Sequence, residues 1–508
     1  MRKRFEQQLS IGVIPINEVE FDKRSRHQLP QILKGLQHIF VDSDLSEAIF
    51  TLLETEINTG KNQAGRPGMT LWEILVLGSV RLALNLDYDG LHDLCNHHQK
   101  LREILGVSKS DFTEEKKYCL NTIKDNVGLL SIELIDKINI EVVKAGHRIV
   151  KKKEDPNLNQ ESKLSLLVRG DSYVLESDIH FPTDLSILWD CSRKVVDCLL
   201  ALGFELSGHR QLVSLRKKIR SSYLKSSDIH RKKGNNYQSR LQESVKLYVL
   251  KSGELLLKSK SSYSRLVLEL ESGTYKNESG IVKLIKALGS YTAYLEQFID
   301  LVNRRILEGE TIPHSEKIFS IFEPEVEWIS KGKSGKAVEF GHRHLIYTDQ
   351  YQFILHHQVM VNQTDKEVAL SAGKQVVLNY GEQTYDFASL SYDRGFYSGP
   401  SKLGLKAFYG QVIMPKSGKK TASEQLEEES ESFVKKKHHH SGVEGNINSL
   451  EQTGLDKCPD RGLERFKNYA ALGVLAYNLR QLGKWINKVE KTKSSKPGAS
   501  SRRMNRAA

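Results

Sequence analysis

Three acidic residues stand in local settings where a carboxylate can hold a metal ion. Asp171 lies inside the apolar run LSLLVRGDSYVL, Asp393 follows the apolar run FASLSY, and Glu444 lies in the predicted helical segment HHHSGVEGNIN. Carboxylates from three elements can hold two divalent cations about 3.5–4 Å apart, so that one activates an attacking oxygen and the other stabilises a leaving oxygen. That chemistry breaks and re-forms phosphodiester bonds.

Each of these acids has a simpler interpretation. Asp171 competes with Asp178 and Asp184, and alternation along a strand does not decide which of them faces a cleft. Asp393, at the end of a predicted buried strand, can instead cap a helix or pair with the neighbouring arginine. Glu444 shares a predicted helix face with Glu451, and any exposed helix can carry such acids.

Other chemistries have weaker signals in this sequence. Two groups of residues invite a zinc site but lack the paired ligand spacing of structural zinc: His438, His439 and His440, and Cys95, His97, His98 and Cys119. The histidines before Glu444 are more consistent with phosphate contacts. The chain has no phosphate-binding G-x-x-x-x-G-K-[ST] loop and no G-x-S-x-G elbow, so we expect neither ATP consumption nor acyl transfer.

Length and charge narrow the class of protein. The chain has 508 residues, 39% of them hydrophobic, which is enough for two to four domains. Its net charge of +12 fits a polyanionic partner such as nucleic acid. The five cysteines are scattered and odd in number, which favours a reducing cytoplasm. The sequence shows neither a signal peptide nor a long apolar segment, so we expect a protein that is not secreted and does not span a membrane.

Residues 1–150 are predicted to form an all-helical domain. Thr70 and Glu73 are spaced as a capping box, so a helix is expected to begin at Leu71. The segment DYDGLHDLCNHHQKLREILG then predicts a turn and a second helix. Such a helix-turn-helix-like pair can present a face to a DNA groove, although two helices and a turn also build many other small domains.

An α/β core is expected after a charged linker near residues 145–160. Its first part, 163–202, reads as one or two strands that carry Asp171, followed by a helix from about 185 to 202. Its second part, 313–490, contains an antiparallel strand pair joined at Asp349-Gln350, then helices that alternate with strands. These patterns predict a mixed sheet with at least one parallel pair. The stretch KSGKKTASEQLEEESESFVKKKHHH predicts a loop or surface helix, and the basic tail 491–508 is expected to be disordered.

Residues 203–312 predict a long-helical, basic insertion into that core. Asp228 alone opposes the positive side chains of its first part: Arg216, Lys217, Lys218, Arg220, Lys225, Arg231, Lys232 and Lys233. Such a run is often only a solvated helix face. We favour a surface that grips a DNA backbone, because acids are nearly absent.

Long stretches of the chain resemble the insertion-sequence transposases of the DDE superfamily, most closely the ISNCY-type family. The resemblance covers most of the chain and is carried by GRPGMTLWEILVLGSVRLALNLDYDGLHDL, DSYVLESDIHFPTDLSIL, FEPEVEWISKGKSGKAVEFGHRHLI, SYDRGFYSG and HHHSGVEGNINSLEQTGLDKCPDRGLERFKNYAALGVLAYNLRQLG. It implies that Asp171, Asp393 and Glu444 are catalytic acids of a ribonuclease-H-like core and hold two Mg²⁺ or Mn²⁺ ions. Related families often carry an Arg one turn before the Glu and a Lys two turns after it, where this chain has His440 and Glu451.

The resemblance also implies partners. The N-terminal helices would recognise the terminal inverted repeats of the element, and the enzyme would act on double-stranded DNA as a homodimer or larger assembly, in the cytoplasm at the nucleoid. The residues predicted to contact DNA are Arg216, Lys217, Lys218, Arg220, Arg231, Lys232, Lys233, Arg394 and His440. Two alternatives stay open: an inactive or domesticated DNA-binding relative, and a metal-dependent nuclease that does not join strands.

Overall fold

The computed structural model describes residues 2–5, 13–22, 24–60, 68–107, 116–154, 162–203, 206–272, 279–330 and 338–494. The chain divides into two compact units. The first unit comprises Met1–Glu176 and Gly341–Ala508, and the second comprises Ser177–Phe340. The second unit therefore contains the predicted insertion, 203–312, together with the helix before it and the segment after it. Most of the predicted tail, from residue 495, lies outside the described residues.

Helices make up the first part of the first unit, as predicted. They are η1 (Ile16–Glu18), α1 (Gln28–Val41), α2 (Ser43–Asn58), α3 (Leu71–Ala83), α4 (Tyr88–His97), α5 (Gln99–Ile104), α6 (Leu120–Val127) and α7 (Ile132–Glu154). The predicted capping box is confirmed: the side chains of Thr70 and Glu73 each accept a backbone N–H of the other's residue, and α3 begins at Leu71.

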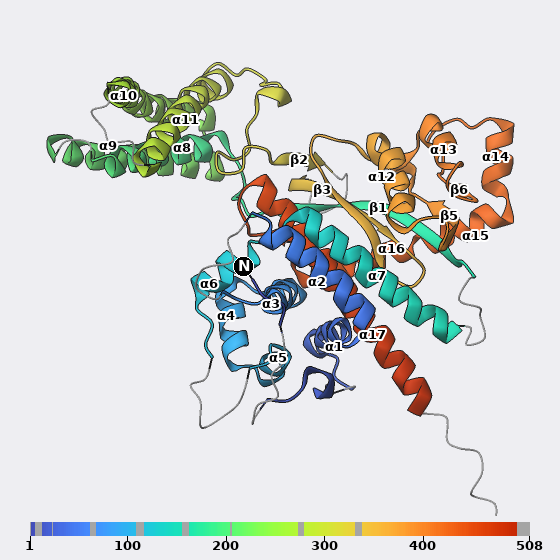
Figure 1. Cartoon of the computed structure of the whole chain (residues 1–508). Helices are drawn as coiled ribbons and strands as arrows, with labels where there is room; N and C mark the ends of the chain where they lie inside the picture. The colour runs from blue at the N-terminus through green and yellow to red at the C-terminus, as the bar shows by residue number, and fades with distance from the viewer. Residues whose placement is uncertain are drawn as a thin grey trace, which may run out of the picture. The chain divides into compact units, whose positions relative to one another are not determined.

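The C-terminal helix α17 (Leu463–Ser494) joins these helices to the rest of the first unit, since it contacts α1, α3 and α7 (Figure 1). Two glycines allow α1 and α17 to approach closely. A Cβ on Gly35 would lie 2.2 Å from the carbonyl oxygen of Leu479, and a Cβ on Gly483 would lie 1.9 Å from that of Gln31. Only glycine fits at these positions without a shift of one helix.

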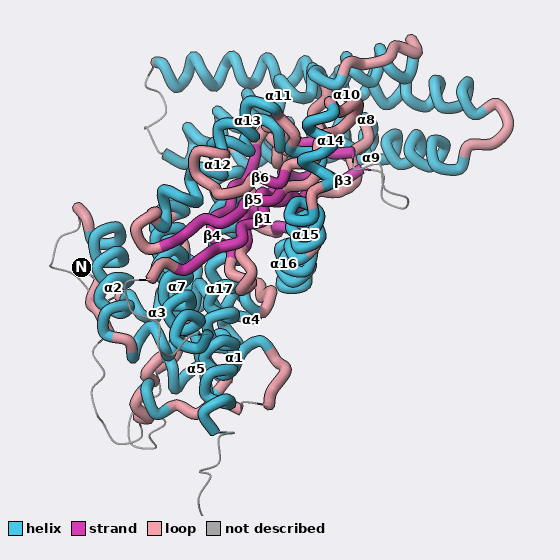
Figure 2. Tube along the Cα trace, turned by 90° about the vertical axis from the view of Figure 1, so that its right-hand side faces the viewer, coloured by secondary structure: helices cyan, strands magenta, loops and turns pink. Residues whose placement is uncertain are grey.

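A mixed sheet of seven strands lies at the centre of the α/β part (Figure 2). The strands are β1 (Leu164–Ser177), β2 (Glu327–Ser330), β3 (Val338–Thr348), β4 (Ile354–Met360), β5 (Tyr385–Ser391), β6 (Val412–Ile413) and β7 (Lys457–Cys458). Their order is β2-β3-β1-β5-β6, and β4 pairs with β3 while β7 pairs with β1. β3 is antiparallel to β1 and β4, whereas β5 is parallel to β1 and β6. The predicted mixed α/β class and the predicted β3–β4 pair are confirmed.

Short helices connect and follow the later strands. They are α12 (Asp365–Tyr380), η4 (Arg394–Phe396), α13 (Gly399–Leu405), α14 (Ala422–Glu429), α15 (Glu431–His440), α16 (Gly442–Leu450) and the turn η5 (Glu451–Leu455). The hydroxyl of Tyr392, after β5, donates to the carbonyl of Ala369 in α12, and a Cβ on Gly170 would meet the Tyr392 ring at 2.7 Å. Gly170 of β1 thus faces α12. Because side chains alternate along a strand, Arg169 and Asp171 point to the opposite face.

The second unit is mainly helical. Its long helices are α8 (Asp184–Ala201), α9 (Leu206–Lys232), α10 (Tyr237–Glu271) and α11 (Ser279–Val302), with the turns η2 (Asn303–Leu307) and η3 (His314–Glu316). They enclose their own hydrophobic cluster, which includes the buried residues Val245, Tyr248, Leu288 and Phe298. Among the described residues, no helix is both long enough and apolar enough to cross a membrane.

Candidate acidic site

Asp171 stands on the middle strand of the sheet, half-buried on the face opposite α12. Its Oδ1 accepts the backbone N–H of Ser172 at 2.8 Å. Burial raises the pKa of Asp171 to about 7, and the charges of Asp393, Asp365 and Glu444 add to the rise against the lowering effect of that hydrogen bond. Acids that are distant in sequence therefore lie within electrostatic range of Asp171.

The parallel pairing of β1 and β5 explains why Asp393 is near Asp171. Arg169 of β1 is in register with Ser391 of β5, so the residues two positions further along, Asp171 and Asp393, leave the paired region at the same level. Asp393 is exposed and caps η4, since its Oδ1 accepts the N–H of Gly395 at 2.8 Å. The helix-cap alternative is therefore correct locally, and the cap uses Oδ1 of this exposed carboxylate.

Glu444 lies in the first turn of α16 and is exposed. The junction between α15 and α16, two to five residues before it, is tied to the ends of β1 and β5. Arg169 Nη1 donates to the carbonyl of His439 at 3.4 Å, and a hydrogen bond of 3.2 Å joins Ser391 Oγ to His440 Nδ1. These contacts bring the start of α16 to the strand ends that carry Asp171 and Asp393.

His440 faces the interior of this junction. Burial lowers its pKa to about 4, and the nearby Arg169 charge lowers it further although Glu444 opposes the shift. The imidazole is consequently neutral near pH 7. The DNA contact predicted for His440 stays a prediction, and it would have to be a hydrogen bond, because the ring carries no charge there.

Asp365 is a fourth acid that sequence reasoning missed. It is the first residue of α12, it is half-buried, and its Oδ1 accepts the hydroxyl of Ser172 at 2.7 Å. One signal for it was present in the sequence, since Asp365 begins the helix predicted directly after the antiparallel strand pair. The rivals of Asp171 lie elsewhere: Asp178 is exposed in the second unit, and Asp184 pairs with Arg305 at 2.6 Å.

The described part of the chain contains no group of three or more His, Cys, Asp or Glu side chains gathered closely enough to hold a metal ion. That statement covers the described histidines and cysteines considered for zinc as well as the acids around Asp171. The acidic site thus consists of Asp171 in the middle of β1, Asp393 after the end of β5 and Glu444 at the start of α16, with the side chains of Asp393 and Glu444 exposed.

The basic residues predicted to contact DNA differ in their surroundings. Arg216 pairs with Asp197 at 2.9 Å, and both Arg231 and Lys232 pair with Asp228, at 2.9 and 2.8 Å. The remaining members are exposed: Lys217, Lys218 and Arg220 on α9, Lys233 after it, and Arg394 beside Asp393. The exposed lysines and arginine of α9 leave the strongest positive face of that helix.

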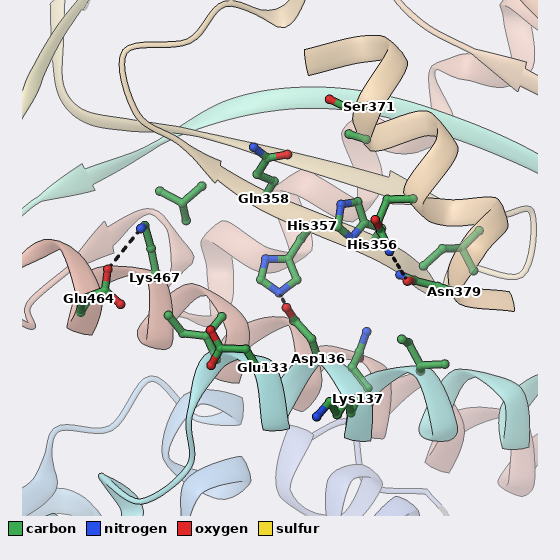
Figure 3. Close-up of a pocket in the computed structure, with 17 residues that line it drawn as sticks. Glu133, Asp136, Lys137, His356, His357, Gln358, Ser371, Asn379, Glu464 and Lys467 are labelled. Carbon is green, nitrogen blue, oxygen red and sulfur yellow. Dashed lines mark hydrogen bonds and ion pairs between the residues drawn. The ribbon is translucent and has the colours of Figure 1, made fainter. Parts of the chain in front are cut away.

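A separate cavity of about 860 Å³ lies between α7, β4, α12 and α17 (Figure 3). Its polar side chains pair with one another: His357 with Asp136 at 3.0 Å, Lys467 with Glu464 at 3.2 Å, and Gln375 with Asn379 at 2.8 Å. His357 also contacts the buried His344, with 3.1 Å between Nδ1 and Nε2. The pair His357–Asp136 joins β4 to α7, whereas the other two pairs each lie within one helix, α17 or α12. The three predicted acids are not among the residues that line this cavity.

Comparison with protein-family models, curated proteins and solved structures yields no match to this chain. The functional interpretation therefore depends on the chain's own residues and on their arrangement.

Proposed function

We propose that this chain is a DDE-type DNA transposase that cuts DNA at the ends of an insertion sequence and joins those ends to a target. One observation carries the proposal. Asp171, Asp393 and Glu444 come from three distant sequence segments, and in the fold Asp393 just after β5 and Glu444 in the first turn of α16 lie within electrostatic range of Asp171 in the middle of β1.

The sheet supports a ribonuclease-H-like core. Five strands run in the order β4-β3-β1-β5-β6, with β3 reversed relative to its neighbours and β5 and β6 parallel to β1. The helix α12 precedes β5, and the second unit interrupts the core directly after β1. On this interpretation the second unit is the helical insertion, and the acids lie at the strand ends where α/β sheets bind ligands.

The acids fit Mg²⁺ or Mn²⁺ by their donor chemistry. Carboxylate oxygens are the hard ligands that these cations prefer. Burial is the main cause of the raised pKa of Asp171, and the smaller contribution from the neighbouring acids is the kind of repulsion that a cation reverses. Asp171, Asp393 and Glu444 would hold two ions. When bound, the ions supply activation of an attacking oxygen and stabilisation of a leaving oxygen.

The protein's own groups prepare this site. The N–H of Ser172 favours the ionised form of Asp171, and the N–H of Gly395 orients Asp393. Neutral His440 holds the α15–α16 junction against Ser391. Water and then a freed 3′-hydroxyl would serve as successive nucleophiles, and no covalent bond to the enzyme is needed.

Double-stranded DNA is the proposed partner, as terminal inverted repeats and as target. The net charge of +12 and the exposed basic face of α9 support this choice. The helices before β1 would read the repeats. The working assembly would be a homodimer or larger, acting in the cytoplasm at the nucleoid.

Replacement of one acid tests the proposal. Asp393→Asn should abolish strand cleavage of a DNA duplex that carries the element's end, while the affinity for that duplex stays within about twofold, because the amide cannot replace the ligand charge. Asp386→Asn is the matched control, since Asp386 is exposed on the same strand β5 and hydrogen bonds to Ser165 at 3.0 Å. An Asp393→Asn protein that still nicks element ends would exclude the assigned role.

An inactive DNA-binding relative is the second candidate. It is favoured by the finding that, within the described residues, the acids are not gathered closely enough to hold a metal ion. Calorimetric titration with Mn²⁺, with and without an element-end duplex, separates the two: binding that appears only with DNA supports a site completed by substrate. A precleaved end offered with a target plasmid then separates transposase from nuclease, because only a transposase yields joined product.

A further inference from the structure

One buried arginine connects three segments beside the acidic site, which are β1, the β3–β4 turn and the end of α15. Arg169 lies on β1, two residues before Asp171 and on the same face, and it is only 7% exposed. Its Nη2 donates to the carbonyl of Asp349 in the β3–β4 turn, and its Nη1 donates to the carbonyl of His439 at the end of α15 at 3.4 Å. A single side chain thus links β1, the β3–β4 turn and the last turn before α16.

The space that this guanidinium occupies depends on a glycine. Gly442 is the first residue of α16, and a Cβ at that position would stand 1.8 Å from Arg169 Nη1. Any larger residue would push either the guanidinium or the helix start away. Glu444 follows only two residues later, so a displacement of the junction would carry this carboxylate away from the strand ends.

The same junction has a second anchor on β5. Ser391 Oγ contacts His440 Nδ1 at 3.2 Å and donates to the carbonyl of Val168 on β1 at 3.4 Å. Ser391 thus contacts the side chain of His440, whereas Arg169 donates to the backbone of His439, so two independent contacts hold the end of α15. Hydrogen bonds from a charged donor to carbonyl oxygens are stronger than neutral ones, so the bonds from Arg169 can help to fix the position of a short helix.

Resting on the proposed function, we propose that Arg169 is a positioning residue that holds the α15–α16 junction, and with it Glu444, against the ends of β1 and β5. Arg169 acts through the backbone carbonyls and through the space beneath Gly442. It does not need to contact DNA or metal. The proposal adds a residue outside the acidic set, and it gives Gly442 a defined role.

We call the contacts of Arg169 with the His439 carbonyl and with Gly442 the clamp. Hydrogen exchange measured by mass spectrometry tests this clamp without DNA or metal. Arg169→Met should speed amide exchange in the segment 438–446 at least tenfold, while peptides from β1 and β5 keep their protection. Arg343→Met is the matched control, since Arg343 lies on β3 and also donates to a backbone carbonyl, that of Gln363 at 3.3 Å. Unchanged exchange in 438–446, or equal loss of protection across β1 and β5, would overturn the proposal.

A second pair of variants tests the contact between Arg169 and Gly442. Gly442→Ala should also speed exchange in 438–446, and adding Arg169→Met should cause little further change, because both substitutions release the same contact. Additive effects of the two substitutions would speak against a shared contact.

Cleavage kinetics distinguish positioning of Glu444 from a purely structural role of Arg169, because a purely structural role would not lower kcat while leaving KM unchanged. Arg169→Met should lower kcat for strand cleavage at least tenfold with little change in KM for DNA, and Arg169→Lys should restore part of the rate. If the wild-type chain fails to cleave DNA but Arg169→Met still loosens 438–446, the proposed function fails while the clamp stands. If cleavage occurs and the segment keeps its protection in the variant, the clamp alone fails.

Discussion

At the scale of single residues, Asp171 is the most perturbed acid of the candidate site. Burial raises its pKa from the ordinary value of 3.8 to about 7. The folded protein therefore holds this proton more tightly than the unfolded chain does. In the absence of cations, the free energy of unfolding must therefore fall as the pH rises from about 4 to about 7. Above about pH 7 it does not fall further through this group.

Removal of the charge should reveal this effect. Asp171→Asn should lose the pH-dependent part, so that its stability relative to wild type rises between pH 4 and 7 by as much as about 4 kcal/mol, at about 1.4 kcal/mol for each pKa unit. Urea unfolding in the presence of a chelator, at several pH values, measures the difference. Asp386→Asn should follow the wild-type curve. Parallel curves for wild type and Asp171→Asn would contradict the raised pKa.

Asp365 contributes to the same titration from the opposite side of β1. Asp365→Asn should lower the pKa of Asp171, because one of the neighbouring negative charges disappears. Carbon-13 NMR of the Asp171 carboxyl group measures the shift. Ser172→Ala is the control, since it removes the hydrogen bond to Asp365 but leaves that charge in place. A pKa that moves equally in both variants would show that the hydrogen bond, and not the charge, is responsible.

Sequence reasoning proposed three acids for the site but did not name the residues around them. Asp171, Asp393 and Glu444 were proposed from their local settings and from a resemblance, and their roles stay predictions. Arg169 and Asp365 matter only through contacts between positions far apart, with His439 and Ser172 as their partners, and no local pattern encodes such a contact. Asp349 was predicted as part of a turn, but its buried pairing with His147, 2.6 Å from Nε2 to Oδ2, needed the fold.

At the scale of elements, hydrophobic periodicity was a good guide where an element has one buried face. The β3–β4 pair, α12 and the order of strands and helices from residue 338 to 413 were predicted from alternation and apolar runs. Elements whose length depends on packing against several partners were harder to predict from the sequence. The long strand β1 pairs with β3, β5 and β7, so its 14 residues depend on three partners at different sequence distances.

The close crossing of α1 and α17 leads to a prediction about stability. Gly483→Ala should destabilise the first unit by about 1–3 kcal/mol, because the new Cβ would lie 1.9 Å from the Gln31 carbonyl oxygen and one helix must move. Gly445→Ala is the matched control, because a Cβ on this glycine of α16 would meet nothing within 4 Å. It should stabilise the helix by about 0.5–1 kcal/mol. Chemical unfolding compares the two, and equal effects would show that the crossing tolerates a side chain.

At the scale of the whole molecule, the two compact units have separate hydrophobic clusters. The N-terminal helices and the sheet share one cluster, although the sequence suggested a boundary near residue 150. The reason lies in α17, which comes last in the chain and packs against α1, α3 and α7 as well as β4. The linker predicted near residues 145–160 is also corrected: residues 145–154 belong to helix α7, and residues 155–161 lie outside the described residues.

The exposed basic face of α9 carries the last prediction. Lys217, Lys218 and Arg220 are exposed, and if each neutralises a DNA phosphate, each loss should reduce the slope of log affinity against log salt by about 0.9. The triple alanine variant should therefore lower the slope by up to about 2.7 and weaken binding most at low salt.

Arg231 and Lys232 provide the comparison on the same helix. Both already pair with Asp228, so part of their charge is compensated within the protein. Their double alanine variant should change the salt slope less per residue than the triple variant does. Fluorescence anisotropy with a duplex of fixed length, over a range of salt concentrations, measures both slopes. If the triple variant keeps the wild-type slope, α9 does not contact the DNA backbone, and the positive charge of this helix serves only its solubility.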